Sequence, residues 1–117
     1  VDHQIPAAGV ILEMNGQTIV FTGDTGPTQE IWKRANKMEK VVALVTEATF
    51  PNDQQDLADE TAHLTPFTFA EELKKITADS PVYASHRKIP FERDIESQIR
   101  NLRDRRARVL LEKNYTL

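Results

Sequence analysis

The chain has 117 residues, which is enough for one domain at most. Hydrophobic residues make up 39% of it and charged residues 28%, as in soluble globular proteins. No apolar run approaches the roughly 18 to 20 residues of a membrane span, so we expect a cytoplasmic protein with no membrane contact. Cysteine is absent, which excludes disulfide scaffolds, thiolate zinc fingers and cysteine nucleophiles. The net charge of −3 disfavours a nucleic-acid partner, since nucleic-acid binders are usually basic.

The first third of the chain predicts a β-hairpin followed by a helix. Two apolar runs, 9–14 and 17–22, flank Asn15 and Gly16, the strongest short signal of a hairpin turn. A proline suited to the first turn of a helix and apolar residues at helical spacing then predict a helix over 27–38.

The middle third predicts a buried strand and a second helix. The continuous apolar run 41–45 is typical of a strand buried on both faces, and we extend it to residue 50. The polar stretch 53–64 fits a loop or a short helix. Thr65 and Pro66 then resemble the cap and first residue of a helix whose buried stripe is formed by three apolar residues, Phe69, Leu73 and Ile76.

The last third adds a strand at 81–85, a helix marked by Ile95, Ile99 and Leu102, and a strand at 109–111. Strands therefore alternate with helices throughout the chain. This alternation predicts the α/β class.

The polar residues that could carry chemistry follow strands or lie in loops: His3, Asp24, Glu47, His63 and His86. Binding groups converge at strand ends in α/β folds, because the loops there vary over a rigid sheet. Imidazoles and a carboxylate from such ends suit Zn²⁺, Mn²⁺ or Fe²⁺.

Each of these residues also has a plainer interpretation. The Gly-Asp-Thr-Gly run around Asp24 could be an Asx turn before a helix, and His3 could belong to a frayed terminus. Glu47 could be a helix-dipole partner or a turn partner. Arg87 and Lys88 could be surface charges. The order and spacing of the residues together favour a functional interpretation.

That order resembles the C-terminal half of a metallo-β-lactamase-fold hydrolase. In this superfamily a histidine precedes a strand, an aspartate lies in a Gly-Asp-Thr turn, and a late histidine follows a short strand, as His3, Asp24 and His86 do here. The run Thr-Glu-Ala-Thr-Phe around Glu47 and the run His-Leu-Thr-Pro from His63 resemble its phosphodiesterase branch. That branch includes class II cyclic-nucleotide phosphodiesterases and tRNA 3′-processing nucleases.

Two further runs make the cyclic-nucleotide phosphodiesterases the most similar group. An Ala-Glu-Glu-Leu segment follows His-Leu-Thr-Pro, and Ile31-Trp32 follows the aspartate turn. The resemblance therefore implies a metal-dependent phosphodiesterase that acts on a cyclic nucleotide such as cyclic AMP, or on a similar phosphodiester. A tRNA 3′-processing-type nuclease and a non-catalytic fragment that keeps the fold are the alternatives.

The sequence departs from the superfamily in one respect, because it contains no His-x-His-x-Asp-His cluster. Residues 1–117 therefore correspond to the C-terminal half of an αββα sandwich, with the N-terminal half on another polypeptide or removed. Such a half should expose an apolar sheet face, and the expected partner is the N-terminal half or a second chain, including a homodimer. The isolated chain should be inactive.

The resemblance also assigns roles to the candidate residues. It implies two divalent metal ions in the complete enzyme, zinc first, with manganese or iron as alternatives. His3 would complete the coordination of one ion and His86 that of the other, while Asp24 would bridge both.

The remaining roles concern the substrate. By the same resemblance, His63 is the proton donor and Glu47 orients it, because a carboxylate partner fixes an imidazole ring. Removing Glu47 should then act like removing His63, only more weakly. Arg87 or Lys88 would hold a phosphate oxygen.

Overall fold

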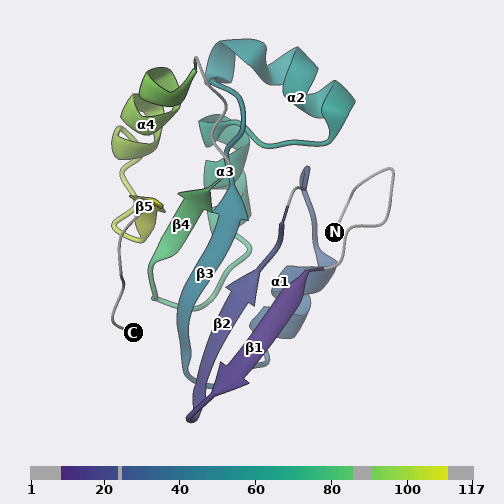
Figure 1. Ribbon diagram of the computed structural model, residues 1–117, viewed down its shortest axis with the longest axis vertical. Coiled ribbons are helices and arrows are strands. Elements are labelled where there is room, and N and C mark those ends of the chain that lie inside the picture. Colours follow the sequence, from purple (N-terminus) through teal and green to yellow (C-terminus); the bar gives the residue numbers. More distant parts are fainter. Residues whose placement is uncertain (1–8, 24, 86–90, 111–117) are drawn as a thin grey trace.

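The computed structural model describes residues 9–23, 25–85 and 91–110. Within these ranges, five strands form one sheet in the order β1-β2-β3-β4-β5 (Figure 1). The strands are β1 (Val10–Met14), β2 (Gln17–Phe21), β3 (Val41–Glu47), β4 (Val82–Ser85) and β5 (Ala107–Val109). β1 is antiparallel to β2, and the other neighbouring strands are parallel. The predicted alternation of strands and helices is confirmed.

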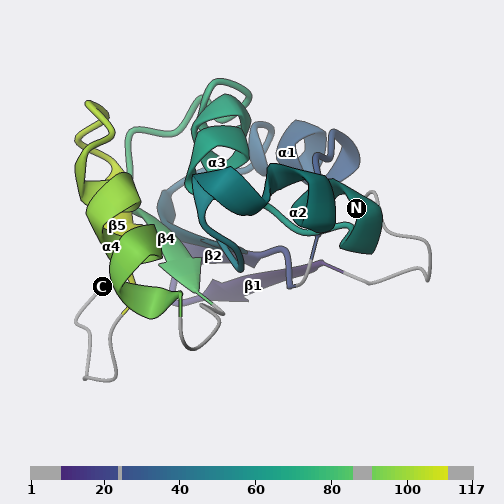
Figure 2. The same cartoon turned by 90° about the horizontal axis from the view of Figure 1, so that it is seen from above.

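The helices bury one face of the sheet. They are α1 (Glu30–Ala35), α2 (Gln55–Thr61), α3 (Pro66–Leu73) and α4 (Glu92–Arg100), and a 3-10 turn over Asn52–Gln54 precedes α2. Figure 2 shows α1, α2 and α3 on one side of the sheet. The core between these layers consists of alternate strand residues and the buried faces of the helices, and it includes Val20, Leu44, Val82, Trp32, Phe69, Ile95 and Ile99.

Local sequence signals predicted the hairpin and the start of α3 correctly. Asn15 and Gly16 have positive φ angles of 54° and 77°, which match the twist of a tight hairpin. Thr65 caps α3: its hydroxyl accepts the Thr68 N–H at 3.3 Å, and its own N–H donates to the Thr68 hydroxyl at 2.8 Å. Pro66 occupies the first turn, where its missing N–H costs nothing.

Three predicted boundaries were wrong. The helix predicted over 27–38 begins only at Glu30 and ends at Ala35, and the Thr28 N–H before it donates to the Glu72 side chain. β3 ends at Glu47 rather than at residue 50, since the chain then turns to pair with Leu64. The last strand lies at 107–109 rather than 109–111, where it pairs with β4; residue 111 lies outside the described residues.

The opposite face of the sheet is apolar and open along β1, and no described helix lies over it there (Figure 2). Val10, Leu12 and Met14 on this face are 46%, 44% and 64% exposed. Val10 pairs with Phe21 and Leu12 with Ile19, so the apolar surface continues onto β2. An apolar sheet face is therefore present as expected, while the nature of its partner stays a prediction.

Candidate functional site

The carboxyl ends of β2, β3 and β4 meet at one edge of the sheet, because these strands are parallel (Figure 1). Polar contacts join the three strand ends. The Thr22 hydroxyl donates to the Thr46 hydroxyl at 2.9 Å, and the Ser85 hydroxyl donates to the Thr46 carbonyl at 2.9 Å. The Ala48 N–H donates to the Ser85 carbonyl at 3.1 Å. This edge is where ligand sites form in α/β sheets.

The predicted metal ligands and phosphate-binding residues lie outside the described residues: His3, Asp24, His86, Arg87 and Lys88. Their described neighbours Gly23, Thr25 and Ser85 belong to this same edge of the sheet. Among the described residues, no group of three or more potential ligands could hold a metal ion. The donor types of His3, Asp24 and His86, two imidazoles and a carboxylate, nevertheless fit a divalent ion such as zinc.

The structure brings the predicted proton donor and its orienting acid together. His63 Nδ1 lies 2.8 Å from Glu47 Oε1, so an Nδ1–H donates to the carboxylate. Glu47 is fully buried at the end of β3, while the His63 side chain is 18% exposed. The bond fixes the orientation and tautomer of the imidazole.

Glu47 also organises the loops around it. Its Oε1 accepts the Thr25 N–H at 3.0 Å, and its Oε2 accepts the N–H groups of Thr49 at 3.1 Å and Leu64 at 3.2 Å. The Thr49 hydroxyl donates to Oε2 at 2.5 Å. These bonds join the segment after Asp24, the end of β3 and the segment before α3. The expectation that Glu47 merely orients His63 is therefore too narrow.

The electrostatics of Glu47 reflect two opposing effects. Burial raises the pKa of its carboxyl above the ordinary value, because the charged form loses hydration. Hydrogen bonds from Thr49 and Thr25, and the charge and hydrogen bond of His63, act in the opposite direction. Burial is the larger effect. The ionised carboxylate therefore loses more free energy through lost hydration than its hydrogen-bond donors restore.

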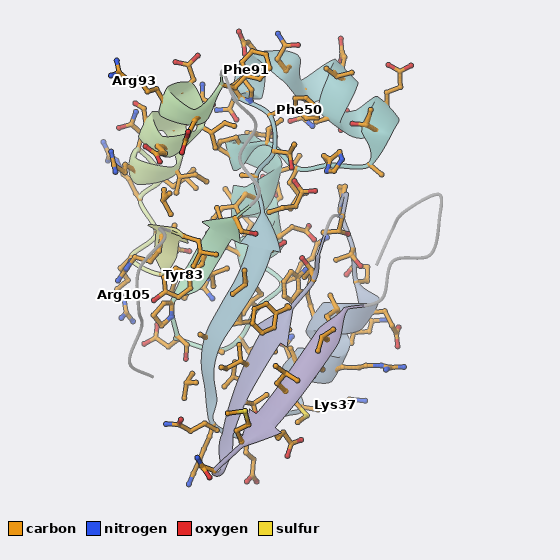
Figure 3. The ribbon with its side chains drawn as sticks, in the orientation of Figure 1. Lys37, Phe50, Tyr83, Phe91, Arg93 and Arg105 are labelled. Carbon is orange, nitrogen blue, oxygen red and sulfur yellow. The ribbon has the colours of Figure 1, made fainter. Side chains whose placement is uncertain are left out.

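His63 is positioned by its backbone and by an aromatic neighbour. α2 ends at Thr61, Ala62 adopts a left-handed conformation with φ of 58°, and the His63 N–H donates to the Ala58 carbonyl at 2.8 Å. The Phe50 ring meets the imidazole edge to face, with centroids 5.9 Å apart. Phe91 lies 6.5 Å from Phe50, and Figure 3 shows both rings at the end of the molecule where β3 and β4 finish.

Sequence reasoning missed two buried polar residues, Thr49 beside Glu47 and Glu72 in α3. Glu72 is 1% exposed in α3, and its Oε1 accepts the Thr28 N–H at 2.9 Å. A signal for its burial was present in the sequence, because Glu72 lies three residues after Phe69 and next to Leu73, within the apolar stripe of α3. Thr49 gave no comparable signal.

An open depression of about 460 Å³ lies far from this edge. It is lined by Glu13 and Thr18 of the hairpin and by residues 37–40. Figure 3 shows Lys37 toward one end of the molecule and Phe50 at the other. The depression therefore does not belong to the site around Glu47 and His63.

A metallo-β-lactamase fold protein, YhfI from Bacillus subtilis, has a similar structure, with a TM-score of 0.69 and 15% sequence identity. The match covers 95% of this chain and 43% of that protein, so the chain spans less than half of its length. No protein-family model matches the sequence, and no curated protein matches it. The structural likeness shows that this chain has the α/β fold of part of a metallo-β-lactamase domain, as the sequence resemblance predicted. Among the described residues, no helix is both long and apolar enough to cross a membrane.

Proposed function

We propose that this chain supplies part of the active site of a metal-dependent phosphodiesterase, which hydrolyses a cyclic nucleotide or a similar phosphodiester within a longer enzyme. The observation that carries the proposal is the Glu47–His63 pair, with 2.8 Å between carboxylate and imidazole. It lies at the sheet edge to which Gly23, Thr25 and Ser85 belong. A buried acid that fixes a partly exposed imidazole beside such an edge suits proton transfer to a bound substrate.

In this proposal His3, Asp24 and His86 hold the metal ions. When bound, the ions would polarise the phosphate and lower the pKa of a water molecule. His63 would give a proton through Nε2 to the departing sugar oxygen, since Nδ1 is bonded to Glu47. Arg87 or Lys88 would hold a phosphate oxygen. The hydroxyl of Thr49 lies 3.4 Å from Nδ1 and 2.5 Å from Glu47, where it supports the pair.

The test compares His63→Ala with the unchanged complete enzyme on two substrates. Turnover of cyclic AMP should fall by roughly 10² to 10⁴-fold, the usual contribution of a general acid, while metal content stays near normal. Turnover of a bis-nitrophenyl phosphodiester should fall much less, because nitrophenolate leaves without a proton.

A matched control is Asn52→Ala, which removes the bond from the Phe67 N–H to Asn52 Oδ1 at 2.8 Å in the neighbouring turn. It should change both rates by the same small factor. Equal losses on both substrates in His63→Ala, in step with lost stability, would mean that His63 only fills its loop. Hydrolysis of a tRNA precursor in preference to cyclic AMP would point to a nuclease instead.

A further inference from the structure

Arginine is concentrated on α4 and β5. Six of the eight arginines of the chain lie within residues 93–108, and this stretch contains no lysine. Its basic side chains outnumber its acidic ones by three, whereas the whole chain has a net charge of −3. The stretch therefore forms a local positive surface, and such a surface attracts anions even where the net charge of the protein is negative. Five of the six arginines are exposed: Arg93, Arg100, Arg103, Arg105 and Arg108.

The sixth arginine, Arg106, has a structural role that the exposed five lack. It donates to three backbone carbonyls at 2.9 to 3.0 Å, those of Leu73, Ile76 and Ala78. Arg105 pairs with Asp79 at 2.6 Å, but both side chains are largely exposed, so water weakens this pair. Within residues 9–23, 25–85 and 91–110, no ion pair involves Arg93, Arg100 or Arg103. These guanidinium groups are therefore accessible to an anionic partner.

The start of α4 lies near the candidate site. Phe91 immediately precedes α4, and its ring centroid lies 6.5 Å from that of Phe50. The Phe50 ring in turn lies 5.9 Å from the imidazole of His63. Arg93 follows Phe91 by two residues, and Figure 3 shows Arg93 and Arg105 on the same outer side of the molecule. The exposed arginines therefore extend from the neighbourhood of the site along α4 to β5.

An exposed aromatic ring flanks these arginines. Phe67 is 59% exposed at the start of α3. Its N–H donates to Asn52 Oδ1 at 2.8 Å, and the Asn52 N–H donates to Gln98 Oε1 of α4 at 2.8 Å. Gln98 lies between Arg93 and Arg100, which are seven residues apart and so lie on one face of the helix. The backbone of Phe67 is therefore held beside the arginine-bearing helix.

We propose that α4, β5 and the start of α3 bind a single-stranded polynucleotide, with the exposed arginines on its phosphates and the Phe67 ring against a base. Guanidinium groups bind phosphate oxygens in a bidentate manner. Proteins that bind single strands combine such charge with aromatic rings on which bases stack. An acidic peptide would pair with the arginines but offers no base to the ring. The proposal concerns binding, and it goes beyond the proposed hydrolysis without depending on it.

The test measures binding of a fluorescein-labelled single-stranded RNA of about 16 nucleotides to the full chain by fluorescence anisotropy, without added metal. Replacing Arg93 and Arg100 together by glutamine should lower the affinity by about tenfold at low salt. It should also reduce the slope of log affinity against log salt by about 1.4, because two phosphate contacts are lost.

The matched control replaces Lys33 and Arg34 of α1 together by glutamine. Both side chains are exposed, and α1 lies on the opposite side of the molecule from α4 (Figures 1 and 2). The control removes the same charge, so it should keep the salt slope and hold the affinity within about twofold. An equal loss in the two double variants would show that only net charge matters and would overturn the proposed surface, as would absence of RNA binding by the unchanged chain.

The aromatic contact is tested with Phe67→Leu, which keeps an apolar side chain but removes the ring. It should weaken binding by roughly fivefold or more, whereas Met14→Ala, at a 64% exposed apolar side chain of β1, should leave the affinity unchanged. No loss in Phe67→Leu, or displacement of the RNA by polyglutamate as effectively as by unlabelled RNA, would overturn the assignment of a polynucleotide. Titration with DNA of the same sequence distinguishes RNA from DNA as the strand that binds.

Discussion

Removing the Glu47 carboxylate should destabilise the fold as well as the proposed site. Glu47→Ala deprives the buried N–H groups of Thr25 and Leu64 of their acceptor, whereas the Thr49 N–H keeps a second acceptor, the Leu64 carbonyl at 3.0 Å. An unsatisfied buried donor costs about 1–3 kcal/mol, so the two together cost about 2–6 kcal/mol. Because burial raises the pKa of Glu47, its removal also relieves a desolvation cost, and we expect a net loss of about 2–3 kcal/mol.

The assay is urea unfolding followed by fluorescence of Trp32, the single tryptophan of the chain, which is 1% exposed when folded. The matched control is Glu71→Ala, which removes an exposed acid paired with Lys74 and should cost no more than about 0.5 kcal/mol. A loss in Glu47→Ala no larger than that of the control would refute the assignment of Glu47 as the group that joins three loops.

Three further predictions concern ionisation, metal binding and the sheet faces. Because the pKa of Glu47 is raised above its ordinary 4.5, its contribution to stability is full below pH 4.5 and declines as the pH rises through the raised value. Glu47→Gln should lack this decline, which urea unfolding at a series of pH values would measure. If the unchanged chain and Glu47→Gln showed the same dependence of stability on pH, the raised pKa of Glu47 would be contradicted. Asp24→Ala should abolish activity of the complete enzyme and lower its metal content, and an active variant with full metal content would exclude a bridging role. Leu12→Lys should change the free energy of unfolding by no more than about 0.5 kcal/mol, since Leu12 is 44% exposed. Leu44→Lys, on the covered face of the sheet, should instead prevent folding, which circular dichroism would show.

Sequence reasoning succeeded where a structure depends on neighbouring residues. Asn15-Gly16 specifies its hairpin because few other pairs accept positive φ at both positions. Thr65-Pro66 specifies the start of α3 because the cap and the proline act within one turn. The contact between Glu47 and His63 was anticipated through the resemblance, although neither residue alone indicates it.

Sequence reasoning failed where side chains distant in the sequence meet. Pro27 and the apolar spacing favour a helix from residue 27, but α1 begins only at Glu30, and the Thr28 N–H donates to Glu72 of α3. The contact spans 44 positions, so no local window contains both partners. For the same reason the breadth of Glu47's hydrogen bonding could not be foreseen, since Thr25 and Leu64 meet it only after the sheet has formed.

Among the described residues, the fully buried acidic side chains are Glu47 and Glu72. Both hold the segment that follows Asp24, and neither lies at the hairpin end of the sheet. An apolar residue of similar volume often gives equal or greater stability than a buried ion, so stability alone does not account for two such acids on one short segment. Their shared position is accounted for if that segment must keep one backbone conformation, which is what a ligand-bearing loop requires. The cost of burying these acids thus indicates that contacts from two separate elements, β3 and α3, hold residues 25–28 in one backbone conformation.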